Sequence, residues 1–281
     1  MNLQTTINSP ISCYGLGMHG GRMCQMTLKP AKQDTGIVFI RTDVKGVDNA
    51  IIADYKNVVE TTLATTLSNA SNIKVATVEH LMAALYSFKI DNIIIELDGP
   101  EIPIMDGSSR PFVFMLYCSG TMELGKKRKK LKILKELSVE NDDTFIQVQP
   151  AANLKIETSI DFSSKAIGRQ HMIYDKGVAF EAEIASARTF GFINDLRYLN
   201  SKGLGLGINL QNAIGIDQND NLLTDLRFED EFVRHKILDS IGDFYTAGDI
   251  EGYFRCHKSG HYLNNQILRK IFSDPSNYLE Y

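Results

Sequence analysis

Apolar residues recur along the first half of the chain with the periods of both strands and helices. The β-branched runs at residues 36–41 and 92–97 are bounded by turn residues and predict strands. Between them, residues 77–88 place apolar side chains at positions i, i+4 and i+7, which predicts a helix with Thr77 as its N-cap.

The second half of the chain carries the same two kinds of pattern. Residues 154–162 alternate apolar with mostly polar positions, which predicts a half-buried strand. Residues 230–247 carry an apolar stripe at helical spacing and are closed by Gly248, which predicts a long helix. Because strands and helices occur in both halves without a steady β-α-β alternation, we predict an α+β fold and not a doubly wound sheet.

Length and one basic segment divide the chain into two predicted domains. A chain of 281 residues is typical of two domains. At residues 126–132, lysines and an arginine interrupt the apolar pattern, and like charges at this density indicate a solvated connector more often than a phosphate or membrane site. We therefore predict an N-terminal α+β domain at 1–125, a basic linker at 126–132 and a C-terminal α+β domain at 133–281.

Charge and composition narrow the classes of function. The formal net charge is -4, so no overall basic surface recommends nucleic acid as a partner. The polar N-terminus and the lack of any apolar stretch near ~18 residues predict a cytoplasmic protein without stable membrane insertion. The four cysteines lack CxxC spacing, which argues against a disulfide framework and against a thiolate zinc site.

Two short segments carry residue types suited to metal or acid–base chemistry. His235 and Asp239 are four apart on one helical face and could share a metal ion, although most pairs at this spacing are surface hydrogen bonds. Glu79 and His80 are adjacent and point ~100° apart, so one could bind a metal while the other acts on water. No second histidine completes an HExxH motif, and alone the pair is typical of an ordinary first helical turn.

Other candidate residues are ambiguous when taken singly. His261 follows a glycine, as in a solvated loop, and Thr189 lies among aromatic residues, where packing is the ordinary role. Residues 203–207 are glycine-rich but lack the lysine and the context of a phosphate loop, so we predict a loop there. His19 has no partner that spacing can assign.

Six segments are informative when they are taken together and in order. They are GLGMH at 15–19, TVEHL at 77–81, DGPEIPIMDGS at 98–108, ARTFGF at 187–192, RFEDEFVRHK at 227–236 and KSGH at 258–261. Six ordered blocks are far more specific than any one of them. From about residue 11 to the C-terminus, the chain resembles the UDP-3-O-acyl-N-acetylglucosamine deacetylase family of lipid A biosynthesis.

The resemblance implies a zinc enzyme in which one ion is bound by His80, His235 and Asp239. Three protein ligands, with the fourth position left to water, are typical of a catalytic zinc site. By ligand type, Fe²⁺ suits the same set.

The resemblance also assigns the acid–base groups. It implies Glu79 as the general base toward the attacking water, His261 as the general acid toward the amine leaving group, and Asp243 as the carboxylate that supports His261. The Thr189 hydroxyl would stabilise the oxyanion, and Lys236 would meet phosphate or developing charge.

The fold that the resemblance implies has two similar layered sheet-and-helix domains, each with an insert, and an active site between them. The insert of the second domain, near 190–215, would form an apolar passage for the substrate's acyl chain and bring Phe190 and Phe192 into contact with it. Many relatives have a second glycine where this chain has Ile208-Asn209. The acyl-chain preference therefore stays open.

The expected reaction is hydrolysis of the N-acetyl group of UDP-3-O-[(R)-3-hydroxyacyl]-N-acetylglucosamine to acetate and the free amine. We expect a monomer acting on this nucleotide-sugar lipid precursor. A zinc hydrolase of another amide or ester has the same chemistry, and a substrate panel separates the two. A non-catalytic metal or nucleotide-sugar binding module would lack the base or the acid, whereas both Glu79 and His261 are present.

Overall fold

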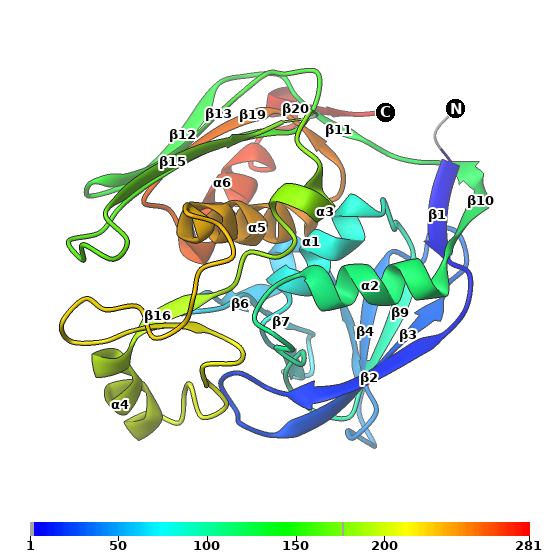
Figure 1. Ribbon diagram of the computed structural model, residues 1–281. Coiled ribbons are helices and arrows are strands. Elements are labelled where there is room, and N and C mark those ends of the chain that lie inside the picture. Colours follow the sequence, from blue (N-terminus) through cyan, green and yellow to red (C-terminus); the bar gives the residue numbers. More distant parts are fainter. Residues whose placement is uncertain (1–2, 176) are drawn as a thin grey trace.

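The computed structural model describes residues 3–175 and 177–281, so residues 1, 2 and 176 of the predicted domains lie outside it. Strands and helices stack in layers (Figure 1), with the sheet of the second half at the top, helices in the middle and the sheet of the first half below. The predicted α+β fold is confirmed. No helix in the described ranges is long and apolar enough to cross a membrane.

The first half is built on one mostly antiparallel sheet, in which a single pair of its described strands is parallel, β4 (Ile37–Arg41) beside β9 (Ile93–Leu97). Two helices cover one face of this sheet, and the first, α1 (Glu79–Ser87), lies between β8 (Lys74–Val75) and β9 in the chain. In spatial order the strands are β2 (Ile11–Leu16), β3 (Met23–Pro30), β9 (Ile93–Leu97), β4 (Ile37–Arg41) and β5 (Ala50–Ile52), and the helices are α1 (Glu79–Ser87) and α2 (Arg110–Ser119).

The second half repeats this topology. Its sheet has the same order of chain segments, again with its third and fourth strands parallel. In spatial order the strands are β12 (Leu137–Asn141), β13 (Thr144–Gln149), β19 (Tyr253–His257), β14 (Lys155–Asp161) and β15 (Arg169–Tyr174), and the helices are α5 (Glu231–Tyr245) and α6 (His261–Ile271). The expectation of two similar layered architectures is thus confirmed.

Smaller elements connect and extend the two layered halves. Edge and connecting strands are β1 (Leu3–Ile7), β6 (Val58–Glu60), β7 (Thr66–Ser68), β8 (Lys74–Val75), β10 (Thr121–Lys127), β11 (Leu131–Ile133), β18 (Ile250–Glu251) and β20 (Tyr278–Glu280). Short 3-10 helices lie at Tyr55–Asn57 and Pro275–Asn277. The insert of the second half contains α3 (Phe180–Glu183), β16 (Phe190–Phe192), α4 (Ile193–Ser201) and β17 (Ile214–Ile216).

The two halves meet where α1 packs against α5. A Cβ atom added to Gly242 of α5 would lie 1.9 Å from the Glu79 carbonyl oxygen, so glycine is required for this approach of the helices. Buried side chains of both halves, such as Phe39 and Phe254, belong to one continuous apolar cluster. The two halves therefore share a core, and residues of both helices come within reach of one another.

The predicted elements at 36–41, 92–97, 154–162 and 230–247 match β4, β9, β14 and α5. The predicted N-cap is wrong, because α1 begins at Glu79 with Val78 in the N-cap position. Thr77 instead has a left-handed backbone (φ 59°), and its hydroxyl donates to Glu101 Oε1 at 3.0 Å.

The basic segment at 126–132 is built into the fold. It begins in β10, which pairs with β1. The Arg128 side chain is only 2% exposed, with Nε 3.0 Å from Asp91 of the first half and 3.3 Å from Asp249 of the second. At Arg128 the prediction of a solvated connector is wrong, because two carboxylates pair with the guanidinium and allow it to be buried. The domain boundaries stay a prediction.

Candidate active site

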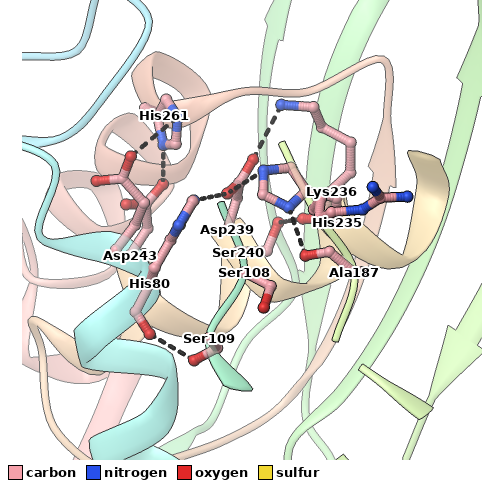
Figure 2. A network of polar contacts seen from close by, with 12 residues as sticks. His80, Ser108, Ser109, Ala187, His235, Lys236, Asp239, Ser240, Asp243 and His261 are labelled. Carbon is pink, nitrogen blue, oxygen red and sulfur yellow. Dashed lines mark hydrogen bonds and ion pairs between the residues drawn. The ribbon is translucent and has the colours of Figure 1, made fainter. Parts of the chain in front are cut away.

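Three residues that spacing and resemblance singled out converge between the halves. His80 comes from the start of α1, and His235 and Asp239 come from successive turns of α5. All three are buried, and they offer ligand atoms within 4.8 Å of one another (Figure 2). Asp239 Oδ1 lies 3.6 Å from His80 Nε2 and 3.4 Å from His235 Nε2. Tetrahedral ligands at ~2.0 Å from an ion lie ~3.3 Å apart, so this set fits a metal.

Hydrogen bonding leaves the ligand atoms available. His235 Nδ1 lies 3.0 Å from the Ala187 carbonyl oxygen and donates to it, which directs the lone pair of Nε2 toward Asp239. Burial lowers the pKa of His235 to about 4, so the ring is neutral at pH 7, as a metal ligand must be. Asp239 Oδ1 is buried and has no hydrogen-bond partner among the described residues. An unpartnered buried carboxylate oxygen is suited to a cation.

Lys236 adds a fixed positive charge beside this group. Its Nζ lies 3.0 Å from Asp239 Oδ2 and 5.8 Å from the centre of the Phe190 ring. Burial opposes ionisation of Asp239, but His235 and Lys236 outweigh it and hold the pKa of that carboxyl well below its usual range. The carboxylate is therefore ionised, and the lysine lies between this candidate ligand group and the aromatic side chain of Phe190.

A second buried cluster adjoins the first. His261 Nδ1 lies 2.8 Å from Asp243 Oδ2, and His261 Nε2 lies 3.8 Å from Glu79 Oε1. Thr65 supports both acids, because its backbone N–H donates to Glu79 Oε2 (3.0 Å) and its hydroxyl donates to Asp243 Oδ1 (2.6 Å). His261 is the first residue of α6, so the loop suggested by its glycine neighbour is wrong. The fold thus places a carboxyl group and an imidazole side by side.

The environment sets the protonation of these two groups in a complementary way. Burial raises the pKa of Glu79. Burial alone would lower the pKa of His261, but Asp243 and Glu79 outweigh it and raise that pKa to about 9. His261 is therefore protonated below about pH 9, and an imidazolium held beside the Glu79 carboxyl group is the arrangement that paired base and acid catalysis requires.

An apolar cavity of about 510 Å³ lies in the insert of the second half, and Thr189 is one of its lining residues. Thr189, Phe190, Phe192 and Ile208 line it, and the residues near 190–215 supply most of its wall. Aliphatic side chains form much of the remainder, namely Leu63, Ile193, Leu196, Leu199, Leu210 and Ile214. Its apolar lining suits a hydrocarbon chain.

The glycine-rich segment at 203–207 is a loop, as predicted, and it lies against the loop at 17–20. Gly207 donates its N–H to the Met18 carbonyl oxygen at 3.0 Å. A Cβ atom at Gly207 would lie 2.2 Å from the Gly17 carbonyl oxygen, so the insert and the loop at 17–20 touch through glycine backbones. Met18 and His19 of this loop line the cavity, so the first half contributes to its wall.

Several residues of the site had no assigned role in the sequence. Threonine and glutamate are common residue types, so the roles of Thr65 and Glu101 follow only from their hydrogen bonds to residues distant in the sequence. Arg188 and Glu231 form a buried pair, Nε to Oε1 at 2.9 Å, that fixes the segment of Ala187 and Thr189 against α5. Arg188, Glu231 and Glu101 lie inside segments that carry the resemblance, which was a signal of position only, and Thr65 lies in none of those segments.

His19 also lines the cavity. Both of its ring nitrogens are buried and lack hydrogen-bond partners among the described residues. In the sequence, the glycines on either side of His19, namely Gly17, Gly20 and Gly21, indicated that the backbone of this loop makes close contacts.

Comparison with known proteins shows the family of the chain. The family model LpxC, described as UDP-3-O-acyl N-acetylglycosamine deacetylase, matches residues 4–273. The chain is 49% identical over 282 residues to a UDP-3-O-acyl-N-acetylglucosamine deacetylase of Oleidesulfovibrio alaskensis, covering 99% of this chain and 91% of the relative. It is 43% identical over 279 residues to the enzyme of the same name from Shewanella loihica, covering 98% and 91%. The chain therefore belongs to the UDP-3-O-acyl N-acetylglycosamine deacetylase family.

Proposed function

We propose that this protein removes the N-acetyl group of a UDP-3-O-[(R)-3-hydroxyacyl]-N-acetylglucosamine by hydrolysis, as a step of lipid A biosynthesis in the cytoplasm. Family membership supports the reaction. The observation that carries the mechanism is the pairing of Glu79 and His261, 3.8 Å apart, beside the ligand group of His80, His235 and Asp239. A binding module has no need of a base and an acid held in this way.

The ligand group fits zinc, and Fe²⁺ shares its preference for two histidines and a carboxylate. Bound there, the ion would lower the pKa of a coordinated water toward ~7 and polarise the substrate's amide carbonyl. His80, His235 and Asp239 would hold it, one ion per chain.

The chain's own groups divide the proton transfers. Glu79 Oε1 accepts a proton from the attacking water while its other oxygen stays hydrogen-bonded to Thr65. His261, protonated below about pH 9, carries the proton at Nε2 that the leaving amine takes up, and Asp243 holds Nδ1 in place. The Thr189 hydroxyl donates toward the carbonyl oxygen as negative charge develops there.

The substrate's acyl chain occupies the apolar cavity in this proposal. Phe190 and Phe192 contact it, and Ile208 restricts the available width. Lys236 lies where the sugar's polar groups leave the apolar wall, with its charge available to phosphate or to the oxyanion. We propose that a monomer suffices, because both halves of one chain supply the site.

The direct test measures acetate release from UDP-3-O-(3-hydroxyacyl)-N-acetylglucosamine of several acyl lengths by the purified zinc-loaded protein. We expect turnover with at least one length and little with N-acetylglucosamine lacking the acyl chain. A zinc-loaded protein that releases no acetate with any length, yet cleaves another amide or ester in a substrate panel, would overturn the substrate assignment.

The pH dependence of kcat/KM follows from the two shifted groups. We expect a bell-shaped profile that rises as Glu79 ionises, above the usual range for glutamate, and falls near pH 9 as His261 loses its proton. In Asp243→Asn, a charge that raises the pKa of His261 is gone, so the alkaline limb should move to lower pH. Asp34→Asn, an exposed change, is the control. An alkaline limb that stays in place in Asp243→Asn would contradict this assignment.

A further inference from the structure

The turn that precedes α1 has an uncommon backbone. Thr77 is 2% exposed and has φ 59°, in the left-handed region that β-branched residues rarely adopt. The turn leads from β8 directly to Glu79 and His80. Strained residues of this kind persist only where surrounding contacts over-determine them, and they gather at functional sites.

One buried carboxylate holds this turn. Glu101 is 5% exposed, and its Oε1 accepts the Thr77 hydroxyl at 3.0 Å. The Glu101 backbone also forms an isolated β-bridge with Ala76, so both the main chain and the side chain of Glu101 hold the turn in place. The hydroxyl bond is charge-assisted and shielded from water, which makes it strong.

The same carboxylate also holds the loop on the cavity wall. Glu101 Oε1 accepts the His19 N–H at 2.8 Å, and Oε2 accepts the Gly20 N–H at 2.9 Å. A Cβ atom at Gly17 would lie 2.6 Å from Glu101 Oε2, so the loop wraps closely around this side chain. Glu101 thus links the loop that carries His19 to the turn that carries Glu79 and His80.

We propose that Glu101 and Thr77 are positioning residues that set where Glu79 and His80 lie relative to α5. The proposal rests on the function proposed above. If Thr77 relaxed to an ordinary backbone conformation, the first turn of α1 would rotate, and both side chains would leave their places opposite His235 and Asp239. A displacement of ~1 Å at a reacting group lowers rates by about 10²-fold.

The test compares Thr77→Val, which keeps shape but loses the hydroxyl, with Thr77→Ser, which keeps the hydroxyl. Glu101→Gln removes the charge without changing shape. Thr6→Val is the matched control, because Thr6 is a fully buried threonine (0% exposed) whose hydroxyl accepts the Ala31 N–H at 2.9 Å, away from the site. Each variant is assayed for kcat, KM and zinc Kd by competition with a chelator.

We expect Thr77→Val and Glu101→Gln to lower kcat by roughly 10- to 100-fold and to weaken zinc binding, with KM within about twofold. Thr77→Ser and Thr6→Val should keep kcat and zinc Kd within about twofold. If Thr77→Val does not fold, Thr77→Gly replaces it, since glycine enters the left-handed region freely. Because glycine lacks both the strain and the hydroxyl, losses in the same direction but smaller than those of Glu101→Gln are expected, still greater than about twofold.

The proposal would be overturned if the hydroxyl-free variant of Thr77 and Glu101→Gln both kept the wild-type kcat and zinc Kd. Equal losses in Thr6→Val would also overturn it. The zinc Kd requires no substrate. It therefore tests the positioning role even if the wild type releases no acetate, an outcome that would count against the proposed function alone.

Discussion

Replacing Glu79 with glutamine is expected to lower kcat by about 10²- to 10⁴-fold, the contribution typical of a general base. Glutamine keeps the shape and can still accept the Thr65 N–H, but it cannot take up a proton. Zinc content should stay near one ion per chain, because His80, His235 and Asp239 are unchanged. The measurements are acetate release and metal analysis of the purified variant.

The matched control for this prediction is Glu96→Gln. Glu96 lies in β9 and pairs with Lys29 at 2.7 Å, away from the ligand group. It should keep wild-type kcat. A Glu79→Gln variant with normal zinc content and kcat within a few-fold of wild type would remove Glu79 from the mechanism.

Removing the metal is expected to have the second large effect. Chelation should abolish acetate release, and returning zinc should restore it. Asp239→Ala should lose the ion and lower the rate by at least about 10³-fold, because one of three ligands and the partner of Lys236 are lost together. Metal content per chain and acetate release before and after zinc addition check both statements.

Asp230→Ala provides a control at the start of the same helix. Asp230 precedes α5 and pairs with Arg234, so its loss leaves the ligand group intact. It should keep its zinc and its rate. If Asp239→Ala retained a full complement of zinc and wild-type activity, the assignment of the metal site would be wrong.

The strands and long helices were predictable because their apolar periods are local. The matching topology of the halves was not, because the order of β2, β3, β9, β4 and β5 depends on pairings between distant segments. Thr77 shows the limit clearly. A threonine before a helical pattern predicts an N-cap, but the buried Glu101 carboxylate provides a better partner and selects a left-handed backbone instead.

The candidate site shows the same division. The spacing of His235 and Asp239 places both side chains on one face of a helix. Because Glu79 and His80 are adjacent in a helix, their side chains point ~100° apart. No local pattern says that these two pairs meet, since that depends on Gly242 and on the packing of α1 against α5. The resemblance to a known family supplied this long-range information, whereas Thr65 and Glu101 became recognisable through their contacts.

The burial of Arg128 also bears on the kinetics of substrate binding. Swinging the two halves apart would withdraw its buried guanidinium from Asp91 or from Asp249, and leaving such a charge unpaired costs roughly 3–5 kcal/mol. The closed arrangement of the halves is therefore favoured. We expect substrate to enter a preformed cavity, so that its association rate responds to solvent viscosity and to the width at Ile208, with no slow opening step beforehand.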